Sequence, residues 1–233
     1  MTISLQKGQR INLEKDDGAK LQRFCVGCNW GAIATQETVT SSGFLGFGKK
    51  TENIKKMIDV DLDLSCILFD SNGKLYDYLY SPLYKKGFLS QFGLPPGKLV
   101  SLDDALRHTG DDTTGDQDGD DGLDNEIITV DLQKINQNIS QIFFFLNNVG
   151  KEDFSQIPFA SIRMFEGSPD RVNKVFATYN ISAEPAYKDK SALVMGELYK
   201  HKDVWKFNAI GDAYPHPHLA ATIQLIAKQY VRS

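Results

Sequence analysis

Hydrophobic residues along the chain gather in short segments that are rich in Val, Ile, Phe and Tyr, and turn-forming residues bound each segment. Some segments alternate in polarity; near the C-terminus, Trp205, Phe207 and Ala209 would share one face of a strand. The pattern predicts strands at residues 21–30, 60–69, 127–132, 142–146, 161–166, 172–181, 192–199 and 204–210. No segment long enough for a helical crossover separates the later strands, so we expect antiparallel pairing. The predicted fold class is mainly β, an antiparallel β-sandwich.

The same pattern predicts few helices, and the clearest of them lies near the C-terminus. Leu219, Ile223, Ile226 and Tyr230 recur at helical spacing, and Pro217 suits the first turn of a helix. We expect this C-terminal helix to dock on the sheets. Other helices should be short, such as a helical turn at residues 131–138.

Two segments are predicted to be loops. Residues 38–50 are rich in Gly, Ser and Thr and carry Phe44 and Phe47, and residues 82–104 contain a Gly-Leu-Pro-Pro-Gly stretch. The chain has neither a repeat of solenoid period nor a clear linker, so we interpret residues 1–233 as a single domain.

Charge is concentrated in one part of the chain. The 233 residues carry a net charge of -4, yet residues 103–126 hold ten acidic side chains and one basic one, Arg107. That segment carries -9 and the remainder +5, scattered without a basic stripe, which argues against nucleic acid as the principal partner. We expect a cytoplasmic location for three reasons. The number of cysteines is odd, no apolar run is long enough to span a membrane, and the polar start has no signal-peptide pattern.

A first acidic cluster consists of Asp59, Asp61 and Asp63. In a strand these side chains would share one face, about 6.6 Å apart, while the intervening Val and Leu residues face the core. Three like charges at this spacing repel one another, and Asp is a poor strand residue. A bound hard cation with oxygen ligands would compensate both costs.

A second cluster occupies residues 108–126, where glycines alternate with acids so that the backbone can turn tightly. Many carboxylates, no thiolate and His108 as the one imidazole favour calcium over zinc. The segment is not an EF-hand, because Asp121 stands where Gly is required and Ile127 where Glu is required. A solvated or disordered acidic loop is the alternative. Two features favour calcium over a solvated loop: the first acidic cluster, and the predicted strand at residues 127–132 that directly follows the second cluster and anchors it.

Other motifs carry less weight. Residues 43–50 nearly match a phosphate-binding loop, but Lys50 replaces the magnesium-binding Ser or Thr. Cys25 and Cys28 have redox spacing without the helix that such a motif needs, so we interpret them as small core residues on opposite faces of a strand. His216 and His218 lack further metal ligands, and no nucleophile elbow is present.

Taken together and in order, the acidic clusters and their flanking motifs resemble the TerD family of bacterial tellurite-resistance and stress proteins. The motif at residues 61–66, Asp-Leu-Asp-Leu-Ser-Cys, resembles the family's Asp-Leu-Asp-Ala-Ser signature, and residues 108–121 resemble its long acidic motif. The other matching segments are residues 3–13, 24–30, 196–201 and 205–211. The resemblance covers nearly the whole chain.

This resemblance implies a calcium-binding β-sandwich, with two ions expected. It also implies a non-catalytic role in resisting tellurite and other stresses, alongside other tellurite-resistance proteins that include an integral membrane partner. The metal ligands that it implies, or leaves open as alternatives, are Asp61, Asp63, Asp111, Asp118, Asp120, Asp121, Asp124, Glu126 and Asp59, with Asp116 as a further alternative.

Two departures from the family pattern affect these ligands. Gly31 follows Trp30 where the family often has Asp. Four residues, 122–125, precede Glu126, so either the pair Asp120 and Asp121 or the segment 124–126 would close the motif.

The leading hypothesis is a calcium-binding stress-response module that is not an enzyme. The first alternative is a small-ligand sensor, since relatives of this family have been described as binding cyclic nucleotide. The second is a metal-dependent hydrolase that activates water in the acidic loop.

Overall fold

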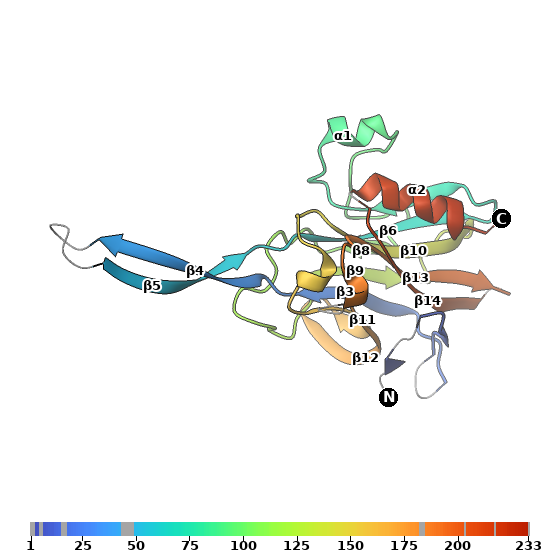
Figure 1. The fold of residues 1–233 in the computed structure, drawn as a ribbon. Helices are drawn as coiled ribbons and strands as arrows, with labels where there is room; N and C mark the ends of the chain where they lie inside the picture. Colours follow the sequence, from blue (N-terminus) through green and yellow to red (C-terminus); the bar gives the residue numbers. More distant parts are fainter. Residues whose placement is uncertain are drawn as a thin grey trace.

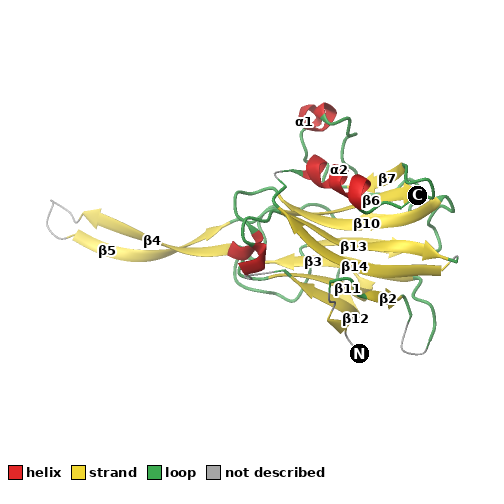
Figure 2. Cartoon of the chain, turned by 45° about the vertical axis from the view of Figure 1, so that its right-hand side comes forward, coloured by secondary structure: helices red, strands yellow, loops and turns green. Residues whose placement is uncertain are grey.

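Two six-stranded sheets pack against each other in the computed structural model, which describes residues 3–4, 7–14, 18–42, 49–181, 185–202, 204–216 and 218–232 (Figures 1 and 2). The first sheet has the order β1 (Ile3–Ser4), β12 (Arg171–Asn180), β11 (Ala160–Ser168), β3 (Arg23–Trp30), β9 (Glu126–Asp131) and β8 (Leu106–His108). The second has the order β2 (Arg10–Asn12), β14 (Val204–Tyr214), β13 (Ala192–His201), β10 (Ile139–Asn148), β6 (Leu62–Asp70) and β7 (Leu75–Leu79). Neighbouring strands run antiparallel except β1 and β12. The predicted sandwich is confirmed.

The central strand β10 has an apolar run because both of its faces are buried. Phe144 lies in the core between the sheets, whereas Phe143 and Phe145 belong to a second core on the outer face of the sheet. Helix α2 (Leu219–Gln229) covers that outer face with Leu219, Ile223 and Ile226 (Figure 2). The prediction of a docked C-terminal helix is confirmed.

The start of α2 depends on His218 as its N-cap. The Nδ1 atom of His218 accepts a hydrogen bond from the N–H of Ala221 at 3.2 Å, and its ring packs against Phe88 and Phe92. Pro217, expected in the first turn, lies outside the described residues. The other helices are α1 (Lys86–Gln91) and the 3-10 turns η2 (Phe154–Gln156) and η3 (Pro185–Tyr187).

Three local predictions need correction. The segment 82–104 is irregular except for α1, and residues 131–138 form turns without a helix. The strand predicted from residue 60 begins at Leu62, so Asp59 and Asp61 precede it. The chain can leave the sheet there because the N–H of Val60 donates to the carbonyl of Thr114 in the acidic loop instead of to a neighbouring strand.

The largest correction concerns residues 38–50, which we predicted to be a loop. The structure extends β4 (Ile33–Ser42) and β5 (Lys49–Ile58) as a paired antiparallel ribbon; residues 43–48, with Phe44 and Phe47, lie outside the described part. The ribbon, here called the arm, projects far from the sandwich (Figure 1). Most residues of the arm are exposed and polar. The sequence therefore lacks the alternation of apolar and polar residues by which we predicted the other strands.

The two cysteines at redox spacing lie on opposite faces of β3, as predicted. Cys28 is buried between the sheets, and Cys25 is buried in a small outer cluster with Ile127 and Phe165. Among the described residues, no helix is both long and apolar enough to cross a membrane.

Candidate metal centre

The acidic loop, residues 108–126, connects β8 and β9 and is attached by its backbone to the strand end at Trp30. The N–H of Asp116 donates to the carbonyl of Trp30 at 3.0 Å, and the N–H of Ala32 donates to the carbonyl of Asp116 at 2.9 Å. The N–H of Val60 donates to the carbonyl of Thr114 at 3.1 Å, while the indole Nε1 of Trp30 donates to the carbonyl of Val60 at 2.8 Å. The two acidic segments of the sequence are therefore joined around one tryptophan.

Carboxylates from both segments meet in what we call the inner group. Asp63 of β6, Asp111 of the loop and Glu126 of β9 place carboxylate oxygens within 4.8 Å of one another. Asp63 and Glu126 are buried, with residue exposures of 4% and 0%. Asp61 lines the same cavity as Asp63 and Asp111. Four of the predicted ligands thus come together across the two sheets.

Glu126 is held in place by main-chain donors. Its Oε2 accepts from the N–H of Leu64 at 2.7 Å, and its Oε1 accepts from the N–H of Asp112 at 3.0 Å. The Nε2 atom of His108 lies 3.4 Å from Oε2 and 2.9 Å from the carbonyl of Leu64. Because Nδ1 of His108 accepts from the N–H of Gly110, the ring proton belongs on Nε2. Glu126 therefore connects the loop to the second sheet.

The inner group fits a hard cation by its donor chemistry. Asp61 Oδ1 and Asp111 Oδ1 are buried oxygens that have no hydrogen-bond partner among the described residues. Buried polar atoms are normally satisfied, so unpaired oxygens beside further carboxylates indicate a missing partner. All the donors are oxygens, which suits calcium and does not suit zinc.

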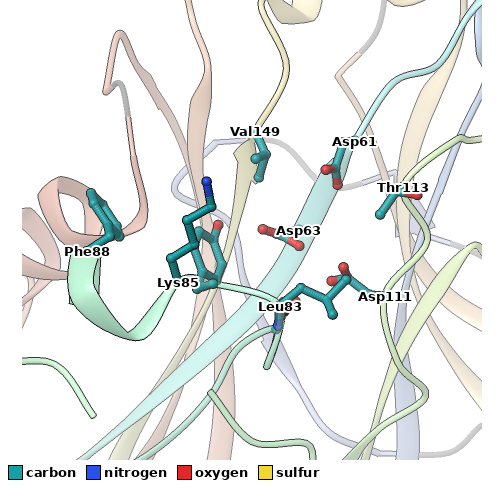
Figure 3. Close-up of a pocket in the computed structure, with 10 residues that line it drawn as sticks. Asp61, Asp63, Leu83, Lys85, Phe88, Asp111, Thr113 and Val149 are labelled. Atoms are coloured by element: carbon teal, nitrogen blue, oxygen red, sulfur yellow. Dashed lines mark hydrogen bonds between the residues drawn. The ribbon is translucent and has the colours of Figure 1, made fainter. Parts of the chain in front are cut away.

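A cavity of about 380 Å³ lies beside the inner group and is lined by two of its members, Asp63 and Asp111 (Figure 3). Asp61, Asp63 and Asp111 face it from one side. The rest of the lining consists of Ser81, Leu83, Tyr84, Lys85, Phe88, Thr113 and Val149. The segment around α1 thus contributes an apolar wall and one cationic side chain to an otherwise acidic cavity.

Crowding of buried carboxylates raises their pKa values. Burial raises the pKa of Asp63 to about 9, and Asp111 adds to the rise while Tyr84 opposes it. Burial raises the pKa of Asp61 to about 6, with further increases from the charges of Asp111 and Glu126. Burial also raises the pKa of Glu126, although hydrogen bonding from His108 lowers it in part. Metal-free protein therefore holds a proton on Asp63 at neutral pH.

This proton predicts that calcium-free protein loses stability as the pH rises from 7 to 8.5. An unfolded Asp is fully ionised in this range, whereas folded Asp63 still binds a proton. The folded state binds more protons, so the free energy of unfolding decreases with pH, by roughly 1–2 kcal/mol over this interval. Urea unfolding in EDTA at both pH values measures the difference. The Asp63→Asn variant should lack most of it, and a wild-type stability that is flat or rising would contradict the assignment.

A second cluster, the outer group, consists of Asp116, Asp120 and Asp121, whose carboxylate oxygens also lie within 4.8 Å of one another. The amide of Asn125 donates to Asp116 Oδ1 at 3.1 Å, and the amide of Asn29 donates to Asp120 Oδ1 at 2.9 Å. Asp120 and Asp121 are exposed and Asp116 is partly buried. The outer group is therefore a more open arrangement than the inner one.

Three predicted ligands lie apart from both groups within the described part of the chain. Asp59 is exposed and accepts from the amide of Gln117 at 3.1 Å, and Asp118 is exposed on the loop. The side chain of Asp124 is buried and pairs with Arg163, whose Nε lies 2.9 Å from its Oδ2. Asp124 also packs over Gly27, where a Cβ would lie 2.1 Å from the same oxygen. Its role in this geometry is to attach the loop to β11 through Arg163.

Comparison with known proteins tests the resemblance seen in the motifs. Residues 1–226 match the sequence model of the TerD domain. The chain belongs to the TerD family. It is 32% identical to the stress response protein SCP2 of Bacillus subtilis, with 91% of this chain and 92% of that protein covered. It is 28% identical to the tellurium resistance protein TerD of Serratia marcescens, covering 92% of each.

A solved TerD homologue has the same fold. The crystal structure of a homologue of the telluride resistance protein TerD from Streptomyces coelicolor superposes with a TM-score of 0.56. The superposition covers 89% of this chain and 96% of the other at 12% sequence identity, which supports the shared sandwich.

The departures from the TerD motifs have structural reasons. Gly31 replaces the Asp that often follows the tryptophan, and a Cβ at this position would lie 2.3 Å from the ring of Phe159. The four residues before Glu126 include Asn125, whose Oδ1 accepts from the N–H of Trp30 at 2.8 Å. Glu126 and the pair Asp120–Asp121 lie in different groups, so they do not compete for one position.

Several residues of the site escaped the sequence analysis. Asn29 braces the outer group, while Tyr84 and Lys85 line the cavity beside the inner one. Asn125 also braces the outer group, but it belongs to the segment 124–126, which the sequence already offered as one alternative for closing the motif. Tyr84 and Lys85 lie in a segment whose sequence has no periodicity that places it near the acids.

Proposed function

We propose that this TerD-family chain is a calcium-binding stress-response protein without catalytic activity. The inner group carries the proposal: Asp63 of β6 converges with Asp111 and Glu126 of the acidic loop, and Asp61 and Asp111 each keep an unpaired buried oxygen there. A calcium ion takes six to eight oxygen ligands, which these carboxylates together with water can supply. When bound, calcium supplies the positive charge that offsets the crowded carboxylates.

We further propose two ions for each chain. Asp61, Asp63, Asp111 and Glu126 would hold the first, and Asp116, Asp120 and Asp121 the second. Two calcium ions would offset the formal charge of -4. The inner ion should bind more tightly, because Asp63 and Glu126 are buried and Leu64 and His108 already orient the Glu126 carboxylate.

In this proposal the protein's own residues order the loop for binding. Trp30 and Val60 hold the middle of the loop, at Asp116 and Thr114, through main-chain hydrogen bonds, and Glu126 fixes its end. The carboxylates therefore need little rearrangement, which lowers the entropic cost of binding.

The stress role and the cellular setting are proposed from the relatives. Curated relatives carry the names tellurium resistance protein, stress response protein and general stress protein. We infer that this chain acts in the cytoplasm in such a response, together with other tellurite-resistance proteins that include an integral membrane partner, and without nucleic acid as a partner.

Calcium titration by isothermal calorimetry tests the metal site. Wild-type protein freed of metal with EDTA should bind two calcium ions, and Asp111→Asn should weaken the tighter one by at least about tenfold, since it removes a charged ligand. Asp118→Asn is the matched control, because it removes an exposed acid of the same loop that lies outside both groups. Absence of heat in the wild-type protein, or equal losses in the two variants, would refute the inner site.

A second candidate function, a small-ligand sensor, is favoured by the cavity beside the inner group. Lys85 offers a positive charge, and Leu83 and Phe88 offer an apolar surface, next to the proposed ion. An anionic molecule with an apolar body suits this combination. Titration of the calcium-loaded protein with a cyclic nucleotide, repeated with Lys85→Met, tests the idea; no heat with the wild-type protein would count against that ligand class.

A further inference from the structure

The arm is an isolated two-stranded ribbon. Its strands β4 and β5 pair along ten residues each, from Ile33 opposite Ile58 to Ser42 opposite Lys49. Among the elements that the structure describes, each of these strands packs extensively only against the other. A two-stranded ribbon is marginally stable in water and normally needs a third strand or a packed face. A ribbon of this length should therefore be stabilised by a further contact.

The two outer edges of the arm differ in charge. The sequence of β5 contains four lysines, of which Lys55 and Lys56 are exposed in the structure. The sequence of β4 contains a single charged residue, Glu37. Lysines along an edge strand oppose the addition of another strand, and an edge without them is open to pairing. The edge of β4 is thus the unprotected one, and its main-chain groups have no partner strand within the described chain.

One face of the arm is also partly apolar. Cross-strand pairing places Val39 and Ile54 on the same face as Ile33 and Ile58. Val39 and Ile54 are 41% and 50% exposed. A strand added beside β4 would widen this face and place its own side chains next to that of Val39.

We propose that the arm joins two copies of this chain by antiparallel pairing of β4 with β4 of the second copy. A two-fold axis at Thr38 places Glu37 opposite Val39 of the second copy, so the two Glu37 side chains do not face each other. Glu37 already has a cation, since Lys56 lies 3.3 Å away within its own chain. The resulting four-stranded ribbon has lysine-bearing β5 strands at both outer edges, so growth stops at the dimer.

A second copy fits better than an unrelated strand because the charge pattern is self-consistent. The edge of β4 is nearly neutral, and pairing it with itself brings no like charges opposite each other. Each copy has one open edge, which a symmetric contact uses completely. The surface belongs to the arm alone and is separate from both acidic groups.

The test measures the mass of the 233-residue chain by sedimentation equilibrium and compares two matched variants with the wild type. Thr38 and Asn53 are exposed cross-strand partners, joined by a side-chain hydrogen bond of 2.9 Å that either substitution removes. We expect wild-type mass to approach about twice 26.1 kDa with increasing concentration, and Thr38→Lys to weaken association at least about tenfold. Asn53→Lys, on the lysine-bearing strand, should associate like the wild type. A monomeric wild type, or equal effects of the two variants, would overturn the proposal.

Disulfide trapping gives a second and independent readout. The three native cysteines, Cys25, Cys28 and Cys66, are buried, so a cysteine added to the arm is the accessible thiol. Residues facing each other in an antiparallel pair have Cα atoms about 4.5–5.5 Å apart, within disulfide range. With oxidised glutathione as the oxidant, Thr38→Cys should form a covalent dimer and Asn53→Cys should not. Equal crosslinking of both variants, or of neither, would contradict the two-fold axis at Thr38.

Discussion

Replacement of Glu126 by Ala is expected to lower the free energy of unfolding of calcium-free protein by about 3–5 kcal/mol. The carboxylate is fully buried and accepts hydrogen bonds from the main chain of Leu64 and of Asp112, beside His108. Removing it leaves the buried N–H of Leu64 and the partly buried N–H of Asp112 without an acceptor and creates a void between the sheets. Urea unfolding at pH 7 in EDTA measures the effect without any contribution from metal.

Glu37→Ala provides the control for this experiment. Glu37 lies on the exposed arm, and its ion pair with Lys56 is open to water, so its loss should change stability by less than about 1 kcal/mol. If Glu126→Ala cost no more than Glu37→Ala, the loop would not depend on Glu126 for its attachment to the second sheet.

A second large effect is expected from Gly115→Ala, which should destabilise the protein by about 2–4 kcal/mol. Gly115 has φ of +69°, a left-handed conformation that L side chains rarely adopt. A Cβ there would also lie 2.6 Å from Cδ1 of the buried Trp30. The Trp30 side chain cannot move away from this Cβ, because its Nε1 donates a hydrogen bond to the carbonyl of Val60 and its ring packs in the core. Thermal and urea unfolding of the metal-free variant measure the loss.

Gly119 separates the two causes. It also has a left-handed φ, +103°, but a Cβ at this position would have no atom within 4 Å. Gly119→Ala should therefore show the backbone strain alone, about 1 kcal/mol. Equal losses at the two glycines would mean that contact with Trp30 does not restrict the loop.

The strands of the sandwich could be predicted because burial leaves a clear signature in their sequences. In β14, Phe207 and Ala209 alternate with half-buried residues, and in β10 the run Phe143 to Phe145 is buried on both faces. Both patterns are local properties of the chain, and the antiparallel arrangement followed from the short connections between strands.

The arm could not be predicted in the same way, since neither of its faces is buried by the rest of the chain. Residues from Ala34 to Lys56 are mostly polar, so no alternation marks them as strands. Their pairing depends on cross-strand contacts such as that of Thr38 with Asn53, which only the folded ribbon displays.

For the candidate site, the sequence indicated which segments converge but not which carboxylates meet. The convergence of Asp63 with Asp111 and Glu126 depends on the pairing of β6 with β10 and of β3 with β9, in sheets built from distant parts of the chain. Asp124 was an equally plausible ligand in the sequence. Only the fold reveals that Arg163 of β11 reaches it.

The base of the arm and the acidic loop share main-chain hydrogen bonds. The N–H of Ala32, one residue before β4, donates to Asp116, and the N–H of Val60, two residues after β5, donates to Thr114. A hinge motion of the ribbon must stretch one or both of these bonds. Hydrogen–deuterium exchange at these two amides therefore measures how often the two bonds open. The exchange rates show whether motion of the arm is transmitted to the acidic loop.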